Sequence, residues 1–145
     1  VHAYILGEHG DSEFVCWSNA YVGVKPIKDV IETIDSFKFE DLKHIADDVA
    51  GAAYEIIKRK QATYYGIGMA LNRIINSILN NENSILPLSV YNQGEYDCEH
   101  VYIGLPAVVN KHGIHHIVKL KLNDEEKQQL KKSATILKEA HQHLM

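Results

Sequence analysis

The stretch Ile85-Leu-Pro-Leu-Ser-Val-Tyr91 opens the part of the chain that decides the fold class. It is rich in β-branched and apolar residues, which favour strands. Three further runs of this kind follow, at residues 100–105, 107–110 and 114–122. Asn-Gln-Gly and Lys-His-Gly segments separate the runs with residue types that are typical of turns. The pattern therefore predicts antiparallel strands joined by hairpins.

Helical spacing of apolar residues precedes this region. Apolar residues that recur three or four positions apart predict an amphipathic helix facing a core. They fall at positions 39, 42, 45, 46, 49, 53, 56 and 57. We expect Asp35 and Ser36 to cap this helix. The pattern breaks at residues 61–66 and resumes from Ile67 to Leu79, and Asn80-Asn81 is expected to end the second helix.

A last helix is predicted after Asn123, where an acid three residues on, Glu126, resembles a capping box. Its apolar residues are at positions 130, 134, 137, 140 and 144. Because helices and strands come in blocks rather than alternating, the fold class is α+β, with long helices packed on a largely antiparallel sheet. The 145 residues suit a single core, so one domain is expected over residues 1–145.

The first residues also read as a strand, at 1–7. They begin without Met and without the features of a signal peptide, and an unpaired strand at the start of a chain needs partners. We therefore expect a further segment upstream of Val1.

Composition excludes several classes of function. The 15 basic and 19 acidic residues give a formal net charge of −4 and are interspersed, which argues against a nucleic-acid partner. No uncharged run is long enough for a membrane span. Two cysteines, Cys16 and Cys98, form no disulfide framework and favour a reducing compartment, the cytoplasm. The clustered histidines at 112, 115, 116, 141 and 143 lack completing ligands, so no metal is expected.

The strongest candidate for chemistry is His9, within Gly7-Glu-His-Gly-Asp-Ser12 at the end of the first predicted strand. Imidazole is the side chain that donates and recovers a proton near neutral pH, and flanking glycines leave room for a substrate. By contrast, Gly66-Ile-Gly68 lies within a helical pattern and lacks the third glycine of a dinucleotide-binding loop, so it is not a phosphate site.

Five motifs occur in order along the chain. They are Gly7-Glu-His-Gly-Asp-Ser12, Trp17-Ser18, Ala62-Thr-Tyr-Tyr-Gly66, Asn81-Glu-Asn-Ser84 and Val101-Tyr-Ile-Gly-Leu-Pro-Ala107. Together they resemble the lactate/malate dehydrogenase family, and most closely its bacterial L-lactate dehydrogenases. The resemblance runs from end to end and corresponds to the C-terminal, substrate-binding half of that family, so it implies an N-terminal dinucleotide-binding domain that this chain does not contain.

The resemblance implies an NAD-dependent interconversion of pyruvate and L-lactate, with His9 as the acid/base. It places Thr63 beside the substrate side chain and Ile67 against the nicotinamide. It also implies a tetramer, and a site at His2 for fructose 1,6-bisphosphate at a subunit interface. The remaining catalytic groups belong to the other half, so the chain alone is expected to be inactive.

Two alternatives stay open. A malate dehydrogenase would share the mechanism, because the residue that selects the substrate lies in the other half, although Ala62-Thr-Tyr-Tyr-Gly66 looks more like the lactate enzymes. The chain could instead be a non-catalytic assembly or ligand-binding module. The sequence departs from bacterial relatives at three places near the site: Cys16 replaces the usual Val, Val15 a frequent Pro, and Gln61 a common Gly.

Overall fold

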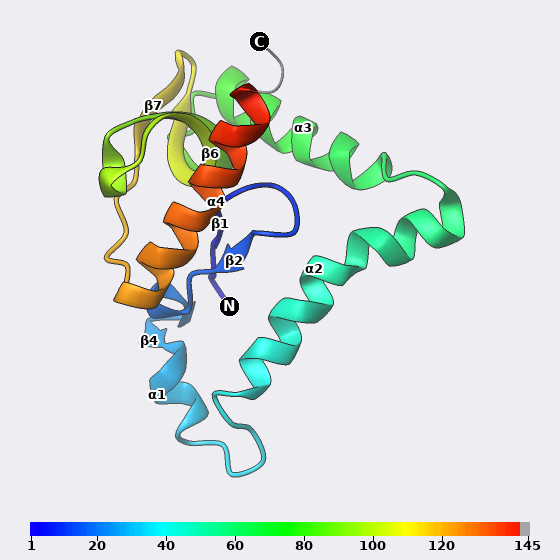
Figure 1. Ribbon diagram of the computed structural model, residues 1–145, viewed down its shortest axis with the longest axis vertical. Coiled ribbons are helices and arrows are strands. Elements are labelled where there is room, and N and C mark those ends of the chain that lie inside the picture. The colour runs from blue at the N-terminus through cyan, green and yellow to red at the C-terminus, as the bar shows by residue number, and fades with distance from the viewer. Residues whose placement is uncertain (143–145) are drawn as a thin grey trace.

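A computed structural model describes residues 1–142 of the chain (Figure 1). A three-stranded sheet, two small β-hairpins and three long helices make up the molecule. The expected α+β class is confirmed. Two of the predicted positions, His143 and the apolar residue at 144, lie outside the described residues.

The main sheet has the order β5 (Ser84–Gln93), β6 (Glu99–Asn110) and β7 (Gly113–Ile117), and both pairings are antiparallel. A short 3₁₀ turn, η2 (Glu95–Asp97), joins β5 to β6. The two runs predicted at 100–105 and 107–110 form one strand, β6, which continues through Pro106.

The run predicted as a strand at 114–122 ends early, at Ile117. Val118 still donates its N–H to the Pro106 carbonyl at 2.8 Å. Pro106 has no N–H to return, so the ladder between β6 and β7 stops there.

The N-terminal segment forms β1 (Ile5–Leu6), β2 (Phe14–Val15), a 3₁₀ turn η1 (Trp17–Asn19), β3 (Tyr21–Val22), β4 (Lys25–Pro26) and α1 (Ile27–Ile31). The predicted strand at 1–7 is therefore shorter than expected. Ile5 and Leu6 pair with β2, whereas His2 and Gly7 make isolated bridges to Tyr21 and Gly104. The run therefore pairs with three different segments and does not form one continuous strand.

Two long helices follow, α2 (Asp41–Lys60) and α3 (Tyr65–Leu79), with the predicted break between them. Gln61 ends α2 in the left-handed conformation, and Asn81 takes the same conformation after α3. The prediction that Asp35 and Ser36 cap α2 is wrong. Tight turns over residues 38–43 lead into the first residues of α2, and the Asp41 carboxylate accepts the Lys38 N–H at 2.7 Å.

The apolar face predicted for α2 does not meet the core of this chain. Leu42 is buried with α1, whereas Ile45, Val49 and Ile56 are exposed. Figure 1 shows α2 and the N-terminal part of α3 as an arm that stands apart from the sheet. Only the C-terminal part of α3 reaches the sheet, where the buried Ser77 hydroxyl donates to the Val109 carbonyl at 3.1 Å.

Helix α4 (Asp124–Gln142) packs against β6 and completes the core. The predicted capping box is confirmed: Glu126 N–H donates to Asn123 Oδ1 at 2.9 Å, and Asn123 N–H donates to Glu126 Oε2 at 3.0 Å. The core joins side chains from β1, β2, β5, β6 and α4, among them Leu6, Phe14, Val90, Ile103, Leu105 and Leu130. This core is the platform from which the loop between β1 and β2 extends.

Candidate functional site

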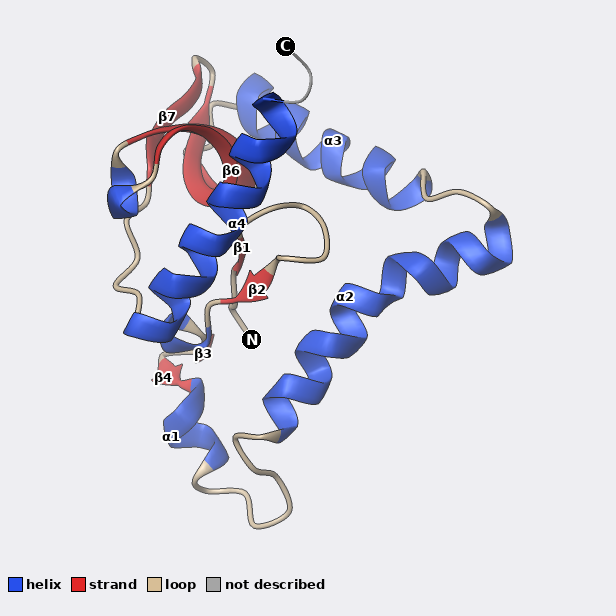
Figure 2. Ribbon diagram, in the orientation of Figure 1, coloured by secondary structure: helices blue, strands red, loops and turns tan. Residues whose placement is uncertain are grey.

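His9 lies on the loop between β1 and β2, and Figure 2 shows this loop extending toward the side on which α2 lies. Its side chain is 96% exposed. The nearest acid is Glu13, whose Oε2 lies 3.9 Å from His9 Nδ1, too far for a hydrogen bond. An imidazole in this position is free to meet a ligand from several directions.

Two glycines fix the start of the loop. Gly7 and Gly104 exchange backbone hydrogen bonds of 3.0 and 2.8 Å, which tie β1 to β6. Gly7 has φ +100°, a conformation that side chains disfavour, and a Cβ there would lie 2.7 Å from Ser133 Oγ. A Cβ on Gly104 would lie 2.6 Å from the Gly7 carbonyl oxygen. This close approach needs glycine on both strands.

Ser133 of α4 anchors the same loop. Its hydroxyl oxygen accepts the Glu8 N–H at 2.5 Å and lies 2.9 Å from Ser12 Oγ. The Ser12 hydroxyl also donates to Glu8 Oε2 at 2.5 Å. Ser133 is fully buried, so both ends of the loop are held on the core while His9 stays outside it.

A hydrogen bond joins the tip of the loop to α2. The Tyr54 hydroxyl donates to Asp11 Oδ1 at 2.7 Å. This hydrogen bond and the negative charge of Asp11 raise the pKa of Tyr54 above its ordinary value. The loop that carries His9 is thereby connected to α4 at its ends and to α2 at its tip.

Thr63 and Ile67 lie on the arm, far along the chain from His9. Thr63 is exposed in the connection between α2 and α3, and Ile67 is 51% exposed in the first turn of α3. Within residues 1–142, no hydrogen bond or ion pair joins either of them to His9.

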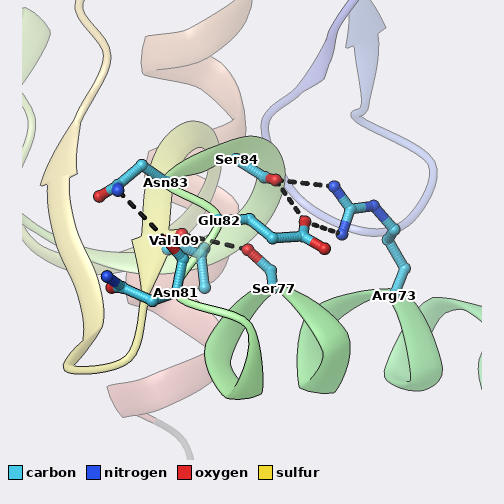
Figure 3. A network of polar contacts seen from close by, with 7 residues as sticks. All are labelled: Arg73, Ser77, Asn81, Glu82, Asn83, Ser84 and Val109. Atoms are coloured by element: carbon cyan, nitrogen blue, oxygen red, sulfur yellow. Dashed lines mark hydrogen bonds and ion pairs between the residues drawn. The ribbon is translucent and has the colours of Figure 1, made fainter.

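A polar network fixes the end of α3 on the sheet (Figure 3). Arg73 donates to Glu82 Oε2 at 2.6 Å and to Ser84 Oγ at 2.7 Å. The Ser84 hydroxyl donates to the same Glu82 oxygen at 2.7 Å. The hydrogen bond from Ser84, followed by that from Arg73, lowers the pKa of Glu82. The orientation of the helix that carries Ile67 therefore depends on these three side chains.

His2 lies near the N-terminus, exposed, and exchanges backbone hydrogen bonds of 2.7 and 2.8 Å with Tyr21. The backbone here is fixed by β3, while the imidazole makes no polar contact within the described part of the chain.

The remaining side chains singled out from the sequence make no site of their own. Burial raises the pKa of the Cys16 and Cys98 thiols. Gly66 and Gly68 lie inside α3. Over residues 1–142 no group of three or more possible ligands is arranged to hold a metal ion, and no helix there has the length and apolarity to cross a bilayer.

Sequence reasoning missed the residues that hold the loop. Ser133 is 125 positions from Glu8, in a helix whose pattern indicates only packing. Tyr54 lies outside the apolar series of its helix. Neither pairing leaves a signal in the local sequence.

Comparisons with known proteins identify the family to which the chain belongs. The profile of the lactate/malate dehydrogenase alpha/beta C-terminal domain matches residues 1–144. An L-lactate dehydrogenase from Geobacillus sp. (strain WCH70) is 50% identical over 139 residues, which are 96% of this chain and 44% of that protein.

Two solved structures are similar in fold as well. A lactate dehydrogenase from a Medee basin deep-sea metagenome library is 70% identical, with a TM-score of 0.92 over 95% of this chain and 44% of its own. The minor L-lactate dehydrogenase of Enterococcus mundtii, in its ligands-bound form, is 46% identical, with a TM-score of 0.94 over 99% of this chain and 46% of its own. The chain thus spans less than half the length of these relatives. It belongs to the lactate/malate dehydrogenase family and corresponds to the family's alpha/beta C-terminal domain.

Proposed function

We propose that this chain is the substrate-binding domain of a cytoplasmic, NAD-dependent L-lactate dehydrogenase that interconverts pyruvate and L-lactate. The observation that carries the proposal is the exposed imidazole of His9 on a loop whose two ends are held by Gly104 and Ser133. The names of relatives about 50% identical to the chain support lactate as the substrate.

His9 acts as the acid and base. Hydride addition to the keto carbon of pyruvate leaves the electron pair of the carbonyl on oxygen, and the imidazolium of His9 gives that oxygen a proton. In the reverse direction, neutral His9 takes the hydroxyl proton of lactate as the hydride leaves. A proton donor at this place lowers the barrier by preventing the build-up of negative charge.

Thr63 and Ile67 line the same pocket in this proposal. Thr63 gives a small wall with one hydroxyl beside the substrate methyl. Ile67, half exposed at the start of α3, offers the apolar surface that suits one face of a nicotinamide ring and excludes water from it. NAD, when bound, supplies or accepts the hydride.

We assign the phosphate-binding elements for NAD to a preceding dinucleotide-binding half. The carboxylate that orients His9 and the arginines that bind the substrate are assigned to the same half. The chain by itself is then inactive, and the complete enzyme is a homotetramer.

His2 is proposed to contribute to an allosteric site for fructose 1,6-bisphosphate. An imidazole becomes a cationic donor for phosphate when protonated, and His2 is exposed on a backbone fixed by Tyr21. In the full-length protein, the effector is expected to lower the apparent KM for pyruvate, and His2→Gln should abolish that response. An unchanged KM in the wild type over several pH values would dispose of the site.

The main test is NADH oxidation by the full-length protein that carries this chain, with pyruvate and oxaloacetate at matched concentrations. His9→Asn should lower kcat by about 10²- to 10⁴-fold. His112→Asn, in the exposed turn before β7, is the matched control and should leave kcat unchanged.

The outcomes separate the remaining candidates. Preference for oxaloacetate would move the protein to the malate branch with the same role for His9. Reduction of neither substrate would favour the non-catalytic assembly module, and full activity of His9→Asn would refute the acid/base role.

A further inference from the structure

The helix α2 is attached to the rest of the chain in an unusual way. One residue of the helix, Leu42 at its start, is buried, and the side chains from 43 onward are mostly exposed. Its ion pairs, Glu55 with Lys58 and with Arg59, stay within the helix. In the described part of the chain, the hydrogen bond from Tyr54 to Asp11 is the polar contact that joins the middle of α2 to another element.

Helical geometry shows that this contact uses the face opposite to the apolar one. Tyr54 is nine residues after Ile45, which places it about 180° around the helix. The apolar series of Ile45, Val49 and Ile56 therefore points away from the loop between β1 and β2, and α2 meets that loop through a phenol.

The other partner, Asp11, lies two residues from His9. Gly10 separates them, and the Gly10 carbonyl accepts the Glu13 N–H at 3.1 Å, which closes a tight turn at the tip. His9 directly precedes this turn, so a displacement of Asp11 reaches His9 through Gly10. A Tyr side chain is rigid, with two rotatable bonds, so its hydroxyl fixes the distance between α2 and the tip.

We propose that Tyr54 and Asp11 form a latch that holds the tip of the loop on α2 and so positions His9. Both are positioning residues, and neither is assigned a contact with substrate. The latch couples the position of α2 to the direction in which the imidazole points. Its kinetic consequence rests on the proposed function, whereas its structural consequence does not.

The test uses Tyr54→Phe, Asp11→Asn and the double variant in the full-length protein. The matched control is Tyr102→Phe, which removes the hydroxyl of an exposed tyrosine on β6. Tyr54→Phe should lower kcat with pyruvate by about threefold to tenfold, and kcat/KM by the same factor, because the proton donor is displaced in the transition state. The double variant should fall no further than the more impaired single variant.

Two spectroscopic readouts do not depend on activity. The ring signals of His9, assigned from the spectrum of His9→Asn, should shift in Tyr54→Phe and stay unchanged in Tyr102→Phe. Asp11→Asn should lower the pKa of Tyr54, followed through its ring carbon that bears the hydroxyl. The hydrogen bond to the carboxylate, and after it the charge of that carboxylate, raise this pKa in the wild type.

Unchanged His9 signals in Tyr54→Phe would overturn the latch, whatever the activity does. If the wild type reduces no keto acid, the proposed function fails, and the latch is still judged on the His9 signals. Shifted signals with full kcat would overturn the positioning role.

Discussion

Gly7 and Gly104 meet backbone to backbone at the base of the loop that carries His9. Gly104 has ordinary backbone angles, so a side chain there is excluded by space alone: its Cβ would lie 2.6 Å from the Gly7 oxygen. Because the Cβ would clash with backbone and not with a flexible side chain, the clash can be relieved only if a strand moves. The first motif and the fifth motif of the sequence are thus two sides of one contact.

Gly104→Ala is therefore expected to destabilise the chain by about 1–3 kcal/mol, the usual cost of overpacking. Gly51→Ala is the matched control, because that Cβ meets nothing within 4 Å and the residue lies inside α2. It should stabilise the chain by about 0.5–1 kcal/mol. Urea unfolding followed by circular dichroism measures both, and equal midpoints for the two variants would contradict the steric argument.

The two thiols give a prediction about alkaline pH. Burial raises the pKa of Cys16 and Cys98 above the ordinary 9.0, so the unfolded chain loses these protons first as pH rises. Their contribution to stability is complete below pH 9.0 and is lost as pH rises through the folded pKa. The double variant Cys16→Ala/Cys98→Ala should lose less stability than the wild type between pH 8 and 10. An identical pH dependence of the two urea midpoints would show that the thiols are not responsible.

At the scale of elements, the polar contacts that fix α3 on the sheet lie in its C-terminal part. Its C-terminal part is fixed by Ser77 on β6 and by Arg73 on Glu82 and Ser84, while its first turn is exposed. The lowered pKa of Glu82 means that the folded chain keeps this carboxylate charged to lower pH than the unfolded chain does. The contribution of Glu82 to the stability of the folded chain is therefore complete above pH 4.5, its ordinary pKa, and is lost as pH falls through the pKa of the folded state.

Arg73→Met should loosen this end of α3 and remove part of that acid dependence. Amide hydrogen exchange at residues 74–79 should become faster, and acid unfolding should shift to higher pH. Arg59→Met, which breaks an ion pair confined to α2, is the control and should leave α3 unaffected. Exchange rates in α3 that match the wild type would mean that Ser77 alone fixes the helix.

The sequence pattern predicted correctly those helix and strand boundaries that are set by neighbouring residues. The capping box at Asn123, the left-handed end of α3 at Asn81 and the break before Tyr65 all follow from residues within one turn of each boundary. The early end of β7 follows from Pro106, which lies far from it in sequence, so the strand signal in residues 114–122 alone overestimated its length.

The site follows the same rule on the scale of the whole molecule. His9 could be proposed as a site residue from its own hexapeptide, whereas the residues that contact its loop, Ser133 and Tyr54, are identified only through the fold. The apolar pattern of α2 indicated an amphipathic helix, as observed, but a pattern contains no information on which surface covers the apolar face. Here the face turned to the loop is the one that carries Tyr54.

The uncovered face leads to a prediction about assembly. Apolar side chains at helical spacing are exposed on both helices of the arm, at Ile45, Val49 and Ile56 on α2 and at Leu71 and Ile75 on α3. Scattered exposed apolar residues are ordinary, but contiguous rows of them mark surfaces that another protein surface covers. Because a homotetramer is proposed for the complete enzyme, a second copy of the chain is the expected partner for this surface.

Sedimentation of the chain should therefore show association that grows with concentration. Ile45→Lys/Val49→Lys adds two positive charges per copy in place of apolar surface and should abolish it. Asp47→Lys also adds two positive charges, which brings the formal net charge from −4 to −2, but it does so on the opposite side of α2. It should retain the association, because the apolar row is intact. If the two variants weaken association equally, charge and not the apolar row is responsible for it. If the wild type is monomeric at all concentrations, the prediction is wrong, and the dinucleotide-binding half becomes the expected partner of the apolar surface.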